Sequence, residues 1–188
     1  MQHIEQYLAD LKATLDALDP AQIKAARDMV AAVRERGGQL ILCGNGGSAA
    51  TASHLANDLG KGASYGRQGP RFRVLALTDN VPWITALAND VSYDVIFSEQ
   101  LRNLGQAGDV LLAISGSGNS RNILEAVRVA KEIGMEVIGW TGFGGGQLAG
   151  AADLAIIADS HHMGRVEDVH TILMHLICYY FMEEDGTA

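Results

Sequence analysis

Two short loops rich in glycine and hydroxyl-bearing side chains are the residues of this chain best suited to chemistry. Residues 44–48 read Gly-Asn-Gly-Gly-Ser, and residues 115–120 read Ser-Gly-Ser-Gly-Asn-Ser. Each loop follows an apolar, strand-like run and opens into a helix-like segment. A strand, a tight turn and a helix N-terminus together present backbone N–H groups, a positive dipole end and hydroxyl donors to an anion. The two loops therefore predict a phosphorylated ligand.

The second loop carries more hydroxyl groups than a turn requires. Ser115, Ser117 and Ser120 fall within six residues, around two glycines. Neither loop has the Gly-x-x-x-x-Gly-Lys-Ser/Thr spacing of a Walker-type ATPase or the Gly-x-Gly-x-x-Gly spacing of a dinucleotide-binding fold. A third glycine-rich run, at residues 142–146, also departs from the dinucleotide spacing and is interpreted as a turn between a strand and a helix. Both of these nucleotide-binding classes are therefore disfavoured.

The pattern of apolar residues predicts a β-sheet that would position the two glycine loops. Apolar runs suited to buried parallel strands fall at residues 39–43, 73–77, 109–114, 136–140 and 153–158. Helical stretches are predicted at residues 48–61, 119–133 and 166–183. Alternating strands and helices predict an α/β fold with a doubly wound sheet of five parallel strands, which binds ligands at the carboxyl ends of its strands. Both glycine loops lie at those ends.

Two further helices are predicted before the first strand. The first has an apolar stripe with steps of three and four, formed by Ile4, Leu8, Leu11, Leu15 and Leu18. Asp19 and Pro20 then begin a second helix, which ends at a pair of glycines. We interpret residues 1–37 as an N-terminal helical hairpin and residues 38–188 as an α/β core, both within one domain spanning residues 1–188. The stripe could pack within the subunit or against a second copy.

Composition limits the classes of protein to consider. The chain has 188 residues, of which 48% are hydrophobic and 19% charged, as in a folded globular protein. A net charge of -8 without a basic stripe argues against nucleic acid as the principal partner. Cys43 and Cys178 are the two cysteines, so no disulfide framework is expected. The first residues lack the layout of a secretory signal, and no apolar run approaches the ~18 residues that span a bilayer. We therefore expect a cytoplasmic protein with no membrane partner.

At this point several motifs together resemble a known family. Residues 43–48, then His54 and Asp58, then residues 108–120 look like a SIS (sugar isomerase) domain. Adding Ala-Asn-Asp at residues 88–90, Thr-Gly at 141–142 and Arg-Val-Glu-Asp-Val-His at 165–170 makes the chain similar to bacterial phosphoheptose isomerases. Those enzymes interconvert sedoheptulose 7-phosphate and D-glycero-D-manno-heptose 7-phosphate. The resemblance implies a flavodoxin-like SIS fold, a phosphosugar substrate and, as in related isomerases, a homotetramer.

The resemblance also implies roles for individual residues. Asp58 corresponds to the catalytic carboxylate, and His175 to its partner histidine on the final helix. The phosphate and the sugar would be bound by Asn45, Gly46, Gly47, Ser48, Asn89, Asp90, Ser115, Gly116, Ser117, Ser120 and Glu167. Some members of the family bind zinc, and the corresponding ligands here would be His54, Asp58, Glu167 and His175. A Zn²⁺ cofactor is therefore expected.

The spacing of these residues agrees with either acid–base catalysis or zinc binding. His54 and Asp58 are four residues apart, so both project from one face of a helix, and Glu167, Thr171 and His175 step by four along another. An aldose–ketose isomerisation needs a base that removes the proton alpha to the carbonyl and an acid at the oxygens. Two histidines and two carboxylates could equally form a tetrahedral zinc site that polarises the carbonyl.

The chain departs from the family pattern at four sites, one of which is three residues long. Asp58 replaces the usual glutamate and is one methylene shorter, whereas Glu167 stands where glutamine is common and favours a cation. Residues 60–62 read Gly-Lys-Gly in place of Thr-Gly-Arg, and Gly164 replaces an acidic residue. These changes leave open whether the substrate is sedoheptulose 7-phosphate.

Three functions are compatible with these motifs. We favour a metal-assisted phosphosugar isomerase, because the four candidate metal ligands together exceed what a binding module needs. The alternative is a non-catalytic SIS protein that senses a phosphosugar or acts as a regulatory adaptor, as relatives associated with the replication initiator do. A phosphosugar lyase or etherase on the same fold is the third.

Overall fold

The computed structural model describes residues 1–184, which are built around a parallel sheet. Its strands are β1 (Gln39–Gly44), β2 (Arg73–Ala76), β3 (Val110–Ser115), β4 (Glu136–Thr141) and β5 (Leu154–Ile157). They are ordered β2-β1-β3-β4-β5, and every neighbouring pair is parallel. Every residue of β3 is buried, as expected for a strand covered on both faces. The predicted doubly wound, five-stranded α/β sheet is confirmed.

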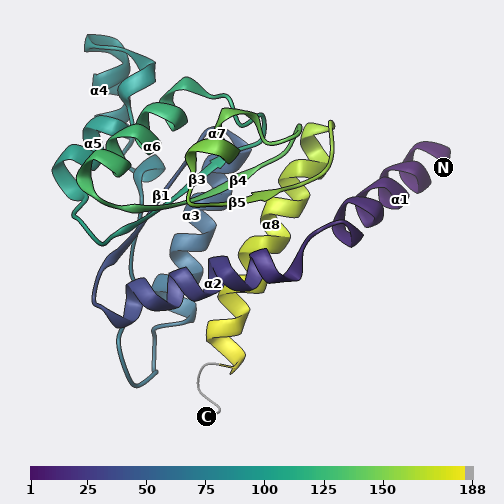
Figure 1. The fold of residues 1–188 in the computed structure, drawn as a ribbon, viewed down its shortest axis with the longest axis horizontal. Coiled ribbons are helices and arrows are strands. Elements are labelled where there is room, and N and C mark those ends of the chain that lie inside the picture. The colour runs from purple at the N-terminus through teal and green to yellow at the C-terminus, as the bar shows by residue number, and fades with distance from the viewer. Residues whose placement is uncertain (185–188) are drawn as a thin grey trace.

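Helices cover both faces of the sheet (Figure 1). One face packs against α2 (Pro20–Glu35), α3 (Gly47–Asn57) and α8 (Met163–Tyr179). The other packs against α5 (Ser98–Leu104), α6 (Arg121–Ile133) and α7 (Gly146–Ala151). Side chains alternate between the two cores, so that Leu42 lies in the first and Ile41 in the second. Within residues 1–184, no helix combines the length and the apolar character needed to cross a membrane.

The expected pair of leading helices is present. Asp19 caps α2 by accepting a hydrogen bond from the backbone N–H of Ala21 at 2.8 Å. The first helix, α1 (Gln2–Asp16), extends outward from the body of the protein (Figure 1) and packs chiefly against α8. There the Tyr7 hydroxyl donates to Asp168 at 2.6 Å. Leu11, Leu15 and Leu18 of the predicted stripe pack against the core, whereas Ile4 and Leu8, nearer the N-terminus, are left exposed.

Two connections contain short helical elements that position the site. After α3 the chain forms a π-helical turn (Asp58–Gly62), in which the N–H of Ala63 donates to the carbonyl of Asp58 at 2.8 Å. The sequence predicted one uninterrupted helix here, and the π-turn is a feature common at functional sites. Between β2 and α5 lie the 3₁₀ turn Leu77–Asp79, helix α4 (Val81–Asp90) and a second 3₁₀ turn (Tyr93–Val95) that packs against α6.

Candidate functional site

The two predicted loops meet at the carboxyl edge of the sheet. Strands β1 and β3 are neighbours, but the helix that follows β1 covers one face and the helix that follows β3 covers the other. This divergence is the topological switch point at which open α/β sheets bind ligands. The side chains of Asn45 and Asn122 bridge it with reciprocal amide hydrogen bonds of 2.9 and 2.8 Å. The structure therefore brings together the two loops that the sequence assigned to a phosphorylated ligand.

The first loop supplies a helix N-terminus. Gly46 precedes α3 with a φ of +54°, a left-handed conformation that favours glycine, and Gly47 begins the helix. Ser48 lies in the first turn and is buried, with 6% of its surface exposed. N–H groups in the first turn of a helix have no acceptor within it, so this end can receive an anion.

The second loop holds its hydroxyl groups with internal hydrogen bonds. Ser115 ends β3, and its hydroxyl donates to the Ser120 hydroxyl at 3.2 Å, just before α6. The N–H of Asn119 donates to the Ser117 hydroxyl at the same distance. Gly116 lies under Met163, whose sulfur would be 2.5 Å from a Cβ at that position. The three serines and the N-terminus of α6 are thus gathered in one turn.

The glycine-rich run at residues 142–146 is the predicted strand-to-helix turn, between β4 and α7, and it also supports the serine loop. The N–H groups of Gly142 and Leu148 donate to the carbonyls of Gly116 and Gly118, both at 2.9 Å. A Cβ on Gly118, whose φ is +67°, would lie 2.1 Å from the carbonyl oxygen of Gly145. The close backbone approach explains why glycines stand on both sides of this contact.

A second cluster lies further along α3, where His54, Asp58 and His175 meet. His54 projects from α3, Asp58 from the π-turn and His175 from α8. His54 Nε2 is 3.4 Å from an Asp58 carboxylate oxygen, and the two imidazole rings pack edge to face with centroids 5.2 Å apart. One potential ligand atom from each residue lies within 4.8 Å of the other two. Three nitrogen and oxygen ligands with a fourth position open are typical of catalytic zinc.

Glu167, the fourth predicted ligand, lies outside this three-residue cluster. Its carboxylate packs on the start of α3, so that a Cβ on Gly47 would be 2.7 Å from the carboxyl carbon. The positive end of the helix dipole favours a carboxylate there. Glu167 and Thr171 line a cavity of about 290 Å³ between α3 and α8, which His54 also lines. This cavity therefore connects the first glycine loop to the histidine cluster.

Asn89 and Asp90, predicted to bind sugar hydroxyls, end α4 with exposed side chains. The Asn89 amide donates to the Asp90 carboxylate at 2.7 Å. Three residues further on, the Tyr93 hydroxyl donates to the side-chain oxygen of Asn45 at 3.0 Å. Tyr93 and Asn122 were not predicted from the sequence, although the position of Asn122 two residues after the serine loop was a usable signal.

Two other titratable groups on α8, His170 and Cys178, are buried in the core. Burial lowers the pKa of His170 to about 4, against the opposing effect of the Thr141 carbonyl 3.3 Å from its Nε2. Burial raises the pKa of the Cys178 thiol to about 12, and the nearby Asp58 charge adds to this. Near neutral pH His170 is therefore uncharged and Cys178 is a thiol.

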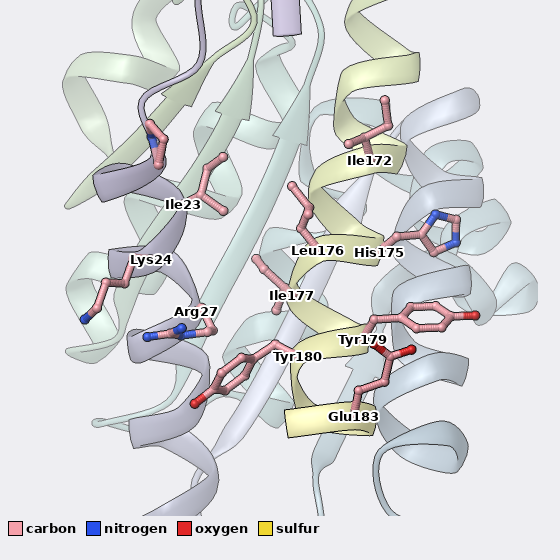
Figure 2. Close-up of a pocket in the computed structure, with 11 residues that line it drawn as sticks. Ile23, Lys24, Arg27, Ile172, His175, Leu176, Ile177, Tyr179, Tyr180 and Glu183 are labelled. Carbon is pink, nitrogen blue, oxygen red and sulfur yellow. The ribbon is translucent and has the colours of Figure 1, made fainter. Parts of the chain in front are cut away.

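A separate apolar groove of about 710 Å³ lies between α2 and α8 (Figure 2). The Arg27 guanidinium lies over the Tyr180 ring in this groove, 4.2 Å from its centroid. His175 and Tyr179 project from α8 on the side away from α2 (Figure 2), so His175 stands at the edge between the groove and the histidine cluster. Leu176 and Tyr179 are about half exposed, at 52% and 48%.

Comparisons with known proteins agree with this geometry. Residues 6–142 match the family model of the SIS domain. A phosphoheptose isomerase of Rhodospirillum rubrum is 42% identical over 173 residues, which cover 92% of this chain and 90% of that protein. The structure of a phosphoheptose isomerase from Neisseria gonorrhoeae matches with a TM-score of 0.87 at 32% identity, over 96% of this chain and 97% of the other. A phosphoheptose isomerase structure from Francisella tularensis gives 0.89 at 32% identity, over 97% and 98%. The chain therefore belongs to the SIS-domain family and is a relative of the phosphoheptose isomerases.

Proposed function

We propose that this protein is a phosphoheptose isomerase that interconverts sedoheptulose 7-phosphate and D-glycero-D-manno-heptose 7-phosphate. The observation that carries the proposal is the meeting of His54, Asp58 and His175 beside a cavity that leads to the first glycine loop. The identity and coverage of the phosphoheptose isomerase relatives support the choice of substrate. A phosphosugar-binding adaptor would need the loops but not the cluster.

Substrate binding in this proposal divides between two groups of residues. Ser48 and the serines at 115, 117 and 120 hold the phosphate, aided by the N-termini of α3 and α6. Asn45, Asn89 and Asp90 contact the sugar hydroxyls. An anchored phosphate fixes the distance of each sugar carbon from the loop, so that only the correct carbons reach the reacting groups.

The reaction moves one proton between carbons and another between oxygens. Asp58 acts as the base that removes a proton from C1 of the ketose, leaving an enediol, and returns a proton to C2 to give the aldose. His175 gives a proton to O2 as the enediol forms, and the O1 proton is lost when the aldehyde appears. Asp58 and His175 both belong to the cluster, where one nitrogen or oxygen atom of each lies within 4.8 Å of the other.

We further propose that the cluster holds a divalent cation, with zinc the best match to its ligand types. Two imidazoles and one carboxylate, with ligand atoms no more than 4.8 Å apart, fit its coordination with small side-chain movements. Glu167 lines the same cavity as His54 but lies outside the three-residue cluster, so the three cluster residues are the proposed ligands, and Glu167, predicted from the sequence as a fourth, is tested separately. When bound, such an ion would act as a Lewis acid that polarises the substrate carbonyl. Asp58, one methylene shorter than glutamate, would serve as a ligand in this arrangement, which is therefore the alternative to Asp58 and His175 acting as a metal-free base and acid pair.

The proposed assembly is a homotetramer in the cytoplasm. Ile4 and Leu8 on α1 are 57% and 59% exposed, and Leu176 on α8 is 52% exposed. Apolar side chains grouped on neighbouring helices favour contact with another copy. The two free cysteines support a reducing compartment, and the net charge of -8 supports a protein that does not depend on nucleic acid.

An assay of the purified protein against a panel of ketose phosphates tests the proposed function. We expect aldose formation from sedoheptulose 7-phosphate, and its loss in Asp58→Asn with phosphosugar binding retained. Binding of the sugar phosphate by the wild type without any turnover would instead support the adaptor function. Elimination products would support a lyase or etherase.

A further inference from the structure

The side-chain amide of Asn45 has few hydrogen-bonding groups left to offer a ligand. Its oxygen accepts from the Asn122 amide at 2.8 Å and from the Tyr93 hydroxyl at 3.0 Å. Its nitrogen donates to the Asn122 oxygen at 2.9 Å. An asparagine side chain has two acceptor sites and two N–H donors. Both acceptor sites are therefore filled, and one N–H remains that donates to no described residue between 1 and 184.

Asn122 and Tyr93 hold this amide from two sides. Asn122 belongs to α6, and 2% of its surface is exposed, so it forms a fixed base for the pair. Tyr93 comes from the 3₁₀ turn after α4, whose start is capped by the Ser92 hydroxyl accepting from the N–H of Asp94 at 3.1 Å. Ile96, which follows, is 1% exposed and anchors the turn in the core. The Tyr93 hydroxyl is thus held over the first glycine loop by a rigid segment.

We propose that Tyr93 is a positioning residue that selects the sugar portion of the substrate. Its hydroxyl fills the second acceptor site of Asn45, so that Asn45 meets a ligand only as a donor to a carbonyl or hydroxyl oxygen. The same residue links the end of α4, which carries Asn89 and Asp90, to the loop that begins α3. Tyr93 is 54% exposed, so its side chain lies at the surface and is not part of the core.

This inference rests on the proposed function, because it takes Asn45 as a sugar contact. It also predicts different effects on binding of the sugar and on binding of the phosphate. The serine loop has no hydrogen bond to Tyr93 among the described residues, and its hydroxyls are held by their own contacts. Loss of the Tyr93 hydroxyl should therefore weaken binding of the sugar and leave binding of a free phosphate ion unchanged.

The test compares Tyr93→Phe with Tyr65→Phe by calorimetric titration and by steady-state kinetics. Tyr65 is 77% exposed, and its hydroxyl makes no hydrogen bond within residues 1–184, so its variant is the matched control. For Tyr93→Phe we expect the Kd and the KM for sedoheptulose 7-phosphate to rise about fivefold, the effect of one net hydrogen bond. We expect kcat, the melting temperature and the inhibition constant of inorganic phosphate to match the wild type. Tyr65→Phe should equal the wild type in every measurement.

Each other outcome has a distinct meaning. Unchanged Kd and KM in Tyr93→Phe, with an active wild type, would overturn the role of Tyr93 and leave the proposed function standing. Equal weakening of sedoheptulose 7-phosphate and inorganic phosphate would also overturn it, because the effect would then lie in the phosphate site. A wild type that binds the sugar phosphate without turnover removes the proposed enzyme, and the Kd comparison alone then decides on Tyr93. A wild type that does not bind it overturns both.

Discussion

The serine hydroxyls at residues 115–120 already have polar partners before any ligand arrives. Ser120 accepts from Ser115, and Ser117 accepts from the N–H of Asn119. Because each oxygen is held by these contacts, little conformational freedom is lost when a phosphate binds. A neutral loop of this kind binds a dianion through the number and direction of its donors.

Removing one hydroxyl from this loop should weaken binding without unfolding the protein. For Ser117→Ala and Ser120→Ala we expect a loss of about 1.5 to 3 kcal/mol for a charge-assisted hydrogen bond, or about ten- to a hundredfold in affinity for the phosphosugar. Calorimetric titration measures the affinity, and thermal melting provides the control for folding. Unchanged affinity in both variants would remove these serines from the site.

The cluster of His54, Asp58 and His175 can be tested through metal content. We expect protein purified without chelator to contain about one equivalent of zinc, and His175→Ala to lose both metal and turnover, because removing one of three ligands strongly weakens binding. Glu167→Gln is the matched variant, since the Glu167 carboxylate lies against Gly47 and outside the cluster. It should retain the metal. Metal retained by His175→Ala would contradict this ligand set, and metal lost from Glu167→Gln would add Glu167 to it.

At the scale of elements, α8 combines chemistry on one side with core packing on another. Glu167 and His175 face α3, while His170 lies three residues after Glu167 and is buried against Trp140, with ring centroids 6.2 Å apart. The 3.6-residue repeat of a helix places His170 about 140° round the axis from His175 and about 60° from Glu167, on the side that faces the sheet. The same helix therefore positions the candidate ligands and ties them to β4.

The buried His170 predicts that stability falls as the pH is lowered. Its folded pKa of about 4 lies below the unfolded value of 6.5, so the unfolded chain binds the proton more readily and stability decreases as the pH falls through this range. Between pH 7 and pH 5 His170 should account for about 2 kcal/mol of lost unfolding free energy. Urea unfolding at the two pH values should show a smaller loss in His170→Gln. The exposed His161→Gln serves as control, and equal pH dependence in all three proteins would refute the prediction.

Elements with strong local patterns could be predicted from the sequence. The strands were predicted because buried parallel strands form continuous apolar runs, as in residues 110–114. Helix α4 was missed because none of its residues is fully buried, so it lacks a clear apolar stripe, and α7 has only six residues. The π-turn after α3 was also missed, since its start at Asp58 depends on packing such as the contact of Gly62 with Met182.

Some residues of the candidate site could likewise be predicted from the sequence, and others could not. The serine loop was predicted because its residues are adjacent in the chain. The contacts of Asn45 with Tyr93 and Asn122 span 48 and 77 residues, and no periodic pattern reports such pairs. The placement of Glu167 against Gly47 likewise depends on how α3 and α8 pack, which the spacing within either helix does not determine.

At the scale of the whole molecule, α1 is the feature that a single copy does not explain. It extends from the body (Figure 1), is joined to α8 by polar contacts such as Tyr7 with Asp168, and leaves Ile4 and Leu8 open to water. The groove between α2 and α8 (Figure 2) leaves further apolar surface open on the same chain. Association with other copies would cover both.

Replacing Leu8 should therefore weaken assembly. Light scattering on the wild type should give about four times the chain mass of 20.0 kDa. Leu8→Ser should shift this toward smaller species because the contact loses a buried leucine, worth about 2 kcal/mol per copy. Val81→Ser is the control, since Val81 is equally exposed at 60% but lies on α4. A wild-type particle of 20.0 kDa at micromolar concentration would contradict the tetramer.

The central claim is that the loops and the Asp58–His175 pair together form an aldose–ketose isomerase. The most direct measurement follows ¹³C-labelled sedoheptulose 7-phosphate by NMR with the wild-type protein in D₂O. We predict that the C2 ketone signal declines as an aldose heptose 7-phosphate appears with solvent deuterium at C2, because the base exchanges its proton with water. The Asp58→Asn protein should leave the substrate unchanged. A wild-type protein that binds the ketose phosphate yet forms no aldose over the same period would contradict the account.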